Sequence, residues 1–269
     1  MFKYEFMMIA ILVGTLVALV VPFIGSIMIF KRMSMIGEAL SHISLAGVIL
    51  GLILNIDPII GAVMMTLVAA LSIELIRKNL RGYDELALTV ITSVGIGLSG
   101  ILLGFSNSGA NFDSFLFGSI LTISRQEAMI AFILGLFVIV VSIVFYRQFF
   151  MISFDTEGAS LSGINVQRYN ILFIILTAIT VSITSRIVGA LIVSSLMIIP
   201  VAAALQVCKS YRSTLKLSII FSVLSVWMGL FIAYLIPIGI KPGGSIVLSS
   251  TAILVVVLII KSFKHKIRH

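Results

Sequence analysis

The sequence predicts an all-α fold, a polytopic bundle of transmembrane helices with eight or nine spans. Of its 269 residues, 60% are apolar and only 10% are charged, and the mean hydropathy is +1.26. Water-soluble domains carry about 25% charged residues. Apolar windows of about 20 residues, the length that crosses a hydrocarbon core of about 30 Å, recur along the whole chain. Because lipid offers no hydrogen-bond partner to the backbone, such windows are expected to be helices, and they lack the alternation of barrel strands.

Polar breaks divide the chain into nine candidate spans. The first has no basic region before it and no small-residue cleavage pattern, so it is expected to remain as a span and not to be removed as a signal peptide. No repeat and no separate soluble segment is apparent, which predicts a single membrane domain over residues 1–269. The expected spans are residues 6–30, 35–54, 58–76, 86–105, 128–146, 170–185, 188–207, 217–237 and 245–261.

The basic residues predict the orientation of the chain. Of the 18 lysines and arginines, 14 fall in alternate loops and in the C-terminal tail. Loops rich in lysine and arginine stay in the cytoplasm, so the C-terminus is expected inside and, with nine spans, the N-terminus outside. In a protein surrounded by membrane lipid, the formal charge of +8 therefore indicates topology and not nucleic-acid binding.

Two loops are long enough to hold structure of their own. In the outer loop of residues 106–127, Phe115 to Gly118 could form a short interfacial or re-entrant helix. In the inner loop of residues 148–170, the acidic start at Asp155 and the small residues that follow it predict a short amphipathic helix over residues 155–164.

One span carries a pair of ionisable residues. Glu38 and His42 are four residues apart, so they share a helix face and lie about 6 Å apart along its axis. Counted from Arg32 at the inner surface, Glu38 is roughly 9 Å deep and His42 roughly 15 Å deep, near the middle of the bilayer. An oxygen and a nitrogen ligand suit zinc, manganese or ferrous iron. From the residues alone, a metal pathway, a proton relay and a structural pairing of the two side chains all remain open.

Other polar residues are interpreted as structural. Glu74 is expected to pair with Arg77 at a helix end, and Asp57 to cap the helix that begins at Pro58. Cys208, the single cysteine, is expected to pack in an apolar helix and excludes an intrachain disulfide. The histidines of the basic tail are expected to belong to a topology anchor.

The chain has no apparent nucleotide site of its own. Residues 104–109 have the glycine spacing of a phosphate loop, but Ala110 and Asn111 follow where lysine and serine or threonine are required. If ATP drives transport, a separate polypeptide must hydrolyse it, and the helix at residues 155–164 is the expected docking element.

Long blocks of the chain resemble the bacterial ABC-type zinc, manganese and iron permeases. The first block runs from Lys31 to Gly47 and includes Gly37-Glu38-Ala39-Leu40-Ser41-His42, and the second runs from Val188 to Ala204. Residues 155–164 and the terminal Pro242-Gly243-Gly244 fall in the same order as in the family. The resemblance covers nearly the whole chain and is most like the zinc-uptake membrane subunit.

The resemblance implies a transport subunit, not an enzyme, of a bacterial ATP-driven importer in the cytoplasmic membrane. It implies a homodimer that receives zinc, or manganese or iron, from an extracytoplasmic metal-binding protein and works with a separate ATP-binding ABC subunit. No cofactor is implied beyond the transported metal. The metal ligands would be Glu38 and His42; the family usually has Asp where this chain has Glu38. The segment that couples to the ATPase would contain Asp155, Glu157, Gly158, Leu161 and Gly163.

Rival functions make different demands on the same residues. A proton-coupled secondary transporter would use Glu38 and His42 as a relay and would need no ATPase. A permease for larger metal chelates would need a wider pathway and no ligand pair at the midplane. A non-transporting scaffold would need no carboxylate at the depth of Glu38. An enzyme is the least expected class, because no pair of a nucleophile and a base is apparent in the sequence.

Overall fold

The computed structural model describes residues 5–79, 83–105, 116–118, 120, 123–236 and 241–266, and within these ranges the regular structure is helical. The long helices are α1 (Glu5–Phe30), α2 (Ile36–Ile53), α3 (Pro58–Asn79), α4 (Asp84–Phe105), α6 (Arg125–Val144), α9 (Val166–Val188), α11 (Tyr211–Leu235) and α12 (Pro242–Lys266). Three shorter helices are α7 (Tyr146–Phe154), α8 (Thr156–Leu161) and α10 (Val193–Val207).

Eight helices of the described part are long and apolar enough to cross a membrane. They match eight of the nine expected spans, which confirms the all-α transmembrane bundle. The ninth, expected over residues 188–207, is the shorter helix α10, which has 15 residues. Its start is delayed because α9 continues to Val188 and Gly189 then adopts φ +114, a conformation that ends a helix and suits glycine.

The helix starts follow from local side-chain chemistry. Ser124 and Glu127 form a reciprocal capping box at α6, and the Asp57 carboxylate accepts a hydrogen bond from the Ile59 amide at 2.9 Å beside Pro58. The Asn165 side chain accepts from the amide of Arg168 at the start of α9. These groups satisfy amides that a helix leaves unpaired in its first turn.

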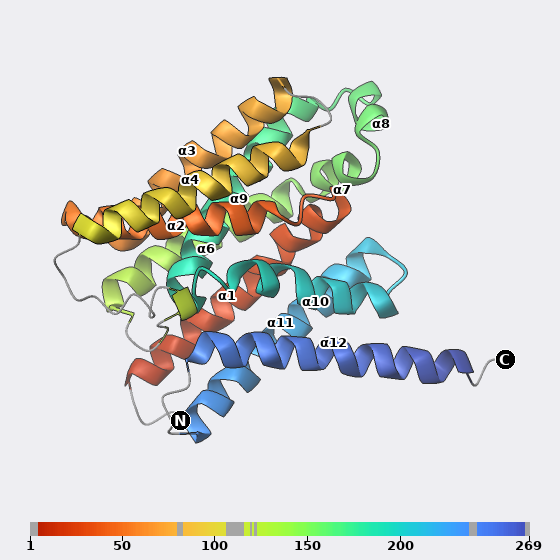
Figure 1. The fold of residues 1–269 in the computed structure, drawn as a ribbon. Coiled ribbons are helices and arrows are strands. Elements are labelled where there is room, and N and C mark those ends of the chain that lie inside the picture. Colours follow the sequence, from red (N-terminus) through yellow and green to blue (C-terminus); the bar gives the residue numbers. More distant parts are fainter. Residues whose placement is uncertain are drawn as a thin grey trace.

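Two helices form the interior of the bundle. In the most apolar windows of α2 and α9, 72% and 78% of the residues are buried by the protein itself, against 28% for α4 and α6. α2 packs most extensively against α3 and α4 and also contacts α9 and α10, while α1 contacts α6, α9, α10 and α11 (Figure 1). α4, α6, α11 and α12 therefore present apolar faces to the surroundings.

The two termini of the described chain lie at opposite ends of the bundle. Figure 1 shows α7, α8 and the C-terminal end of α12 toward one end and the start of α1 toward the other. The expected short helix over residues 155–164 is present as α8, with Asp155 as its N-cap accepting a hydrogen bond from the Gly158 amide at 2.8 Å. Of the proposed outer-loop helix, Phe115 lies outside the described residues, and Leu116 and Phe117 are helical.

Three segments cross at close range where α9 ends. A Cβ on Gly189 would lie 2.4 Å from the amide nitrogen of Gly118, and a Cβ on Gly243 would lie 2.2 Å from the carbonyl oxygen of Val188. The Leu191 amide donates a hydrogen bond to the Leu116 carbonyl at 3.2 Å. Glycine is required here because the backbones of residues 116–118, of the α9–α10 turn and of α12 touch one another.

We expect Gly189→Ala to lower the stability of the detergent-solubilised protein by about 3 kcal/mol. The positive φ of Gly189 is strained for alanine, and the new methyl group would overlap the backbone of residues 116–118. Thermal unfolding followed by circular dichroism measures this. Gly97→Ala in α4 is the control, since nothing lies within 4 Å of its Cβ position, and it should shift stability by less than about 1 kcal/mol. Equal stability of the two variants would contradict the crossing as described.

Candidate functional site

The candidate site lies on the one side of α2 that its neighbours leave open. Of the 18 residues of α2, 13 are buried. Within the first two turns, the residues that are not buried are Glu38, which is exposed, and His42, which is half-buried. The two side chains occupy the same helix face, as their spacing predicted. The structure therefore places both predicted ligands on an accessible stripe of a helix whose N-terminal half is otherwise largely enclosed.

Neighbouring groups hold the backbone of this stripe. The Ser41 hydroxyl donates to the Glu38 carbonyl at 2.8 Å, and the Ser99 hydroxyl of α4 reaches the His42 carbonyl at 3.5 Å. A Cβ on Gly95 would lie 2.9 Å from the amide nitrogen of Ile43 and 3.1 Å from the His42 carbonyl carbon. α4 thus rests directly on the backbone that carries His42, and Gly95 and Ser99 are site residues that sequence reasoning missed.

The continuation of the stripe toward the C-terminal end of α2 is closed by apolar side chains. Leu45 and Ile49 follow His42 by three and seven residues, so they extend the same face of the helix. Both are 3% exposed and cluster with Ala190 of the α9–α10 turn. Partly buried residues pack against this cluster, namely Leu102, Leu103 and Leu116. In this conformation Glu38 and His42 are accessible near the N-terminal end of α2, and the same face is covered toward its C-terminal end.

The donor set available to a metal is small. Within the described ranges, no group of three or more His, Cys, Asp or Glu side chains could hold a metal ion together. One carboxylate and one imidazole make a weak site, which suits an ion in transit better than a resident one. The Ser44 hydroxyl is buried without a hydrogen-bond partner two residues beyond His42.

The predicted coupling residues gather on and beside α8. Asp155 is its N-cap, Glu157 lies in its first turn, and Leu161 at its end is 90% exposed. A Cβ on Gly158 would meet the Asp155 carboxylate at 2.3 Å, and Gly163 has φ +82. These residues lie on a projecting helix away from Glu38 and His42, so the two predicted sets form separate sites.

Aromatic rings connect this projection to the membrane helices. The Phe30 ring of α1 lies 4.7 Å from that of Phe154 in α7, and the Tyr211 ring of α11 lies 5.1 Å from Phe150. Burial raises the pKa of Tyr146, which packs 5.3 Å from Tyr211. α7, which sequence reasoning missed, is thereby anchored to both α1 and α11.

A buried amine lies at the same end of the bundle. Lys31 follows α1, donates to the Asn170 side chain and sits 5.2 Å from the centre of the Phe173 ring. Burial, with the nearby positive charge of Arg77, lowers the pKa of Lys31 to about 8, against a smaller opposing effect of Glu74. The expected Glu74–Arg77 pair is present at 3.2 Å. Lys31 therefore joins α1 to α9 beside α3. The sequence predicted only that it marks a cytoplasmic loop.

Comparisons with known proteins agree with this architecture. The model of the ABC 3 transport family matches residues 3–261. A "Probable metal transport system membrane protein" of Treponema pallidum is 32% identical over 258 residues, which cover 96% of each chain. The "High-affinity zinc uptake system membrane protein ZnuB" of Haemophilus influenzae is 29% identical, over 86% of this chain and 88% of that protein. The "Manganese transport system membrane protein MntC" of Listeria innocua is 29% identical, over 93% and 89%.

Solved structures show the same fold. The structure of "PsaBC from Streptococcus pneumoniae in complex with Fab" matches with a TM-score of 0.85 and 29% identity, covering 95% of this chain and 91% of that chain. A "putative metal-chelate type ABC transporter" in an inward-facing conformation matches with a TM-score of 0.72 at 17% identity, which concerns the fold alone.

The fold and the family match define a multi-pass membrane subunit of an ABC-type transporter, a permease and not an enzyme. The chain belongs to the ABC 3 transport family, as the resemblance in its sequence predicted.

We expect Gly95→Val to lower transport several-fold, because a branched side chain would push α4 off the backbone of Ile43 and His42. The effect is measured as metal uptake by cells that express the variant, divided by the amount of the chain that an immunoblot finds in the membrane fraction. Gly100→Val on the same helix has open space at its Cβ position and should retain transport. Similar losses in both variants would mean that the Gly95 contact has no special role.

Proposed function

We propose that this chain is the permease subunit of an ATP-driven importer that carries a divalent transition-metal ion, zinc in the first place, into the cytoplasm. The observation that carries the proposal is the stripe of α2 on which Glu38 is exposed and His42 half-buried while the rest of the inner half is enclosed. A carboxylate and an imidazole, the only ionisable side chains within this helix, bind zinc and manganese. The family match over residues 3–261 supports transport as the role.

Glu38 and His42 would act as transient ligands to the cargo. Two donors from one chain leave a coordination sphere incomplete, and a second copy related by a two-fold axis would bring a second pair to the same point. Such a homodimer would bury the open stripe of α2 against its partner. The closed apolar cluster around Leu45 and Ile49 supports delivery toward the inner end.

Zinc and manganese are the two candidate cargoes of this chain. Relatives with zinc and with manganese in their names are equally similar, at 29% identity. The segment from Ser41 to Gly47 resembles the zinc-uptake branch, which favours zinc. Glu38 has one methylene more than the Asp usual in the family, which would shift the carboxylate by about one bond length. Such a shift could change the metal preference, so manganese is the alternative cargo.

ATP hydrolysis would come from a separate ABC subunit docked on α8. Leu161 offers an apolar contact at the tip of this helix, and Asp155, Glu157, Gly158 and Gly163 would fix its shape. The rings of Phe150 and Phe154 would pass a displacement of α8 through α7 to α1 and α11. This assignment places α7, α8 and the C-terminus in the cytoplasm, and an extracytoplasmic binding protein on the opposite face of one membrane domain spanning residues 1–269.

The ligand pair can be tested by uptake of radioactive zinc into metal-starved cells that express this chain with its ATPase. We expect His42→Ala and Glu38→Gln each to reduce uptake at least about tenfold, since loss of even an outer-shell partner of a metal ligand typically costs about that much in affinity or activity. Glu38→Asp should retain part of the activity because it keeps the carboxylate. Leu52→Ala, an exposed position at the outer end of the same helix, is the matched control.

The same assay separates the rival functions. Full competition by unlabelled manganese would make manganese the cargo. Uptake that collapses with an uncoupler while ATP is maintained would indicate a proton-coupled transporter instead. Normal uptake by His42→Ala would remove the proposed site and favour a pathway for larger chelates.

Docking on α8 is tested with Leu161. We expect Leu161→Asp to weaken association with the ATPase by about tenfold or more, because a charge replaces an exposed apolar contact at the centre of the interface. Co-purification from membranes and ATP-dependent uptake in vesicles measure this. Leu161→Ile keeps the apolar surface and should behave as the unsubstituted chain; unaltered association of Leu161→Asp would place the docking surface elsewhere.

A further inference from the structure

One face of α1 stays open along the middle of that helix. Over residues 13–28 every residue is buried except Thr15, Leu19 and Phe23, which are half-buried. These three follow one another at intervals of four residues, so they lie on one face of the helix. A buried helix that keeps a single open face over this length offers a path along its axis.

The neighbours of this face show that it is the floor of a groove between α6 and α11. The indole N–H of Trp227 in α11 donates a hydrogen bond to the Thr15 hydroxyl at 3.0 Å. On the other side, a Cβ on Gly135 of α6 would lie 3.0 Å from the Leu16 side chain. Successive residues of a helix are about 100° apart, so Leu19 points between the directions of Thr15 and Leu16. The open face therefore runs between the two flanking helices.

The groove leads to a pocket between α7 and the start of α11. The Phe30 ring at the end of α1 lies 4.7 Å from the Phe154 ring and 5.4 Å from the Tyr211 ring. Tyr211 is also in the wall of the pocket, which encloses about 440 Å³, within the range of small-molecule sites. From Phe30 to Leu19 the helix rises about 16 Å, about half of a hydrocarbon core of about 30 Å. The groove thus has the depth of one leaflet.

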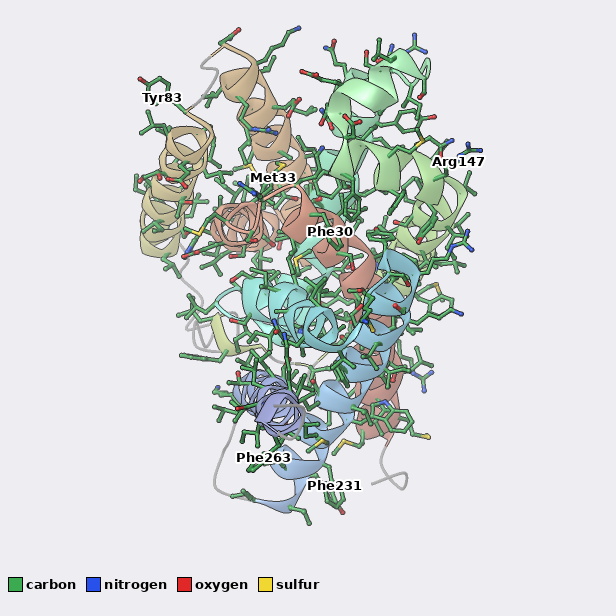
Figure 2. The ribbon with its side chains drawn as sticks, turned by 90° about the vertical axis from the view of Figure 1, so that its right-hand side faces the viewer. Phe30, Met33, Tyr83, Arg147, Phe231 and Phe263 are labelled. Atoms are coloured by element: carbon green, nitrogen blue, oxygen red, sulfur yellow. The ribbon has the colours of Figure 1, made fainter. Side chains whose placement is uncertain are left out.

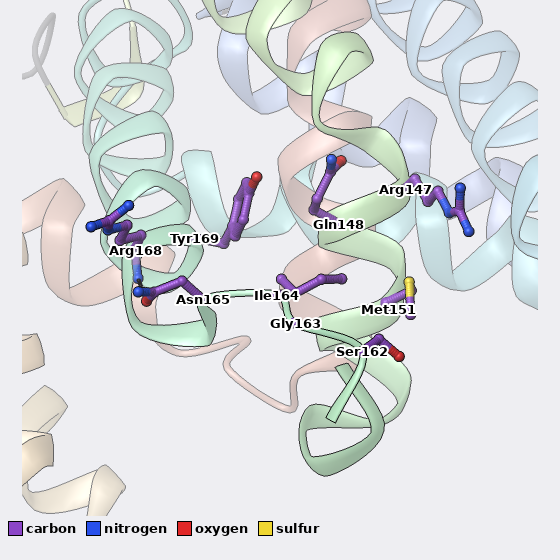
Figure 3. Close-up of a pocket in the computed structure, with 9 residues that line it drawn as sticks. All are labelled: Arg147, Gln148, Met151, Ser162, Gly163, Ile164, Asn165, Arg168 and Tyr169. Carbon is purple, nitrogen blue, oxygen red and sulfur yellow. Dashed lines mark hydrogen bonds between the residues drawn. The ribbon is translucent and has the colours of Figure 1, made fainter. Parts of the chain in front are cut away.

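Two arginines give this pocket a positive charge. Arg147 of α7 and Arg212 of α11 both line it, and both are exposed. The Arg212 guanidinium donates a hydrogen bond to the Tyr146 hydroxyl in the same wall. Figure 3 shows the Arg147 side chain turned away from Arg168, and Figure 2 shows Arg147 at the edge of the molecule. No aspartate or glutamate is among the described residues of the lining, so the pocket is complementary to an anion.

The combination of groove and pocket matches an anionic phospholipid. Apolar side chains are exposed on both walls of the groove, with Ile143 and Val144 of α6 at 57% and 63% and Ile220 of α11 at 52%. Free phosphate would use the arginines but not this apolar path, whereas a phospholipid uses both. Basic pockets beside transmembrane helices are suited to anionic lipid headgroups.

We propose that the groove along α1 holds an acyl chain of an anionic phospholipid and that Arg147 and Arg212 contact the phosphate of its headgroup. Phosphatidylglycerol has this chemistry. The bound lipid would connect the end of α6 to α7 and α11, beside the segment that carries α8. With the orientation proposed above, it belongs to the inner leaflet.

The test is lipid retention by the purified full-length chain. Nanodiscs with an equal mixture of phosphatidylglycerol and phosphatidylcholine are used to load the protein, and native mass spectrometry counts the lipids retained after extraction. Arg147→Gln/Arg212→Gln should reduce retained phosphatidylglycerol about tenfold or more, because each basic side chain near an anionic lipid contributes about fivefold. Lys78→Gln/Arg168→Gln removes the same charge from exposed positions outside this pocket and should leave retention within about twofold.

A second pair of variants tests the groove without changing any charge. Leu19→Trp places a larger side chain on the open face of α1 and should reduce retained phosphatidylglycerol several-fold. Leu248→Trp makes the same change at an exposed position of α12 and should leave retention unchanged. Inorganic phosphate at about 10 mM should not displace the lipid, because the acyl chain contributes most of the affinity.

Three results would overturn the proposal. Equal losses in the two double variants would show a general charge effect, and equal retention by Leu19→Trp and Leu248→Trp would remove the groove as the seat of the acyl chain. Displacement by inorganic phosphate would make free phosphate the ligand. Thermal unfolding of each variant checks that it is folded. Since the assay measures no transport, its outcome is independent of the proposed metal cargo.

Discussion

The backbone of α2 lies directly on the backbone of α3, and much of the bundle is arranged around this contact. A Cβ on Gly47 would lie 2.6 Å from the Gly61 carbonyl oxygen, and a Cβ on Gly61 would lie 2.5 Å from the Gly47 carbonyl oxygen. In lipid, helices gain little from hiding apolar surface from one another, so close packing through small residues is a main source of their association. With α3 on one side and Gly95 of α4 on another, the N-terminal half of α2 is enclosed except on the stripe of Glu38 and His42.

Hydroxyl groups in the membrane helices are mostly satisfied within the helix itself. Thr177 and Thr180 of α9 each donate to the carbonyl four residues earlier, at 2.8 Å. Thr66 of α3 also reaches Ser182 of α9 at 2.6 Å, which adds a polar link between two packed helices. Near the end of α9, Arg186 forms a buried ion pair with Glu127 of α6 at 2.7 Å, where an unpaired charge would be costly. Glu38 and His42 differ from this pair because their side chains are accessible.

The sequence predicted the eight long apolar helices and their order because the length of an apolar window and the bilayer thickness constrain each other. It singled out Glu38 and His42 because two ionisable residues four apart in such a window are costly without a role, and their action as ligands stays a prediction. It did not predict α7: the run Tyr146–Phe154 was read as a span end and a loop, although Phe149 and Ile152 form its buried face. Gly95 and Ser99 could not be assigned to the site because their importance depends on the packing of α4 on α2, a long-range contact with no local pattern. The helix expected from residue 188 begins only at Val193 for a similar reason. The turn at Gly189 depends on its long-range contact with Gly118, which no local pattern reveals.

One face of α2 changes from polar to apolar along the helix axis. Glu38, His42, Leu45 and Ile49 succeed one another on this face, so the ionisable side chains lie in its N-terminal half and apolar carbon follows them. Glu38 lies in the first turn of the helix, where it is exposed. Exposing Leu45 would require Ala190 and Leu116 to move away from it, and both belong to segments held by the glycine crossing at Gly118, Gly189 and Gly243. The apolar closure and the stripe of Glu38 and His42 are thus parts of one packed unit, and a change at the crossing should alter access to His42 without touching either side chain.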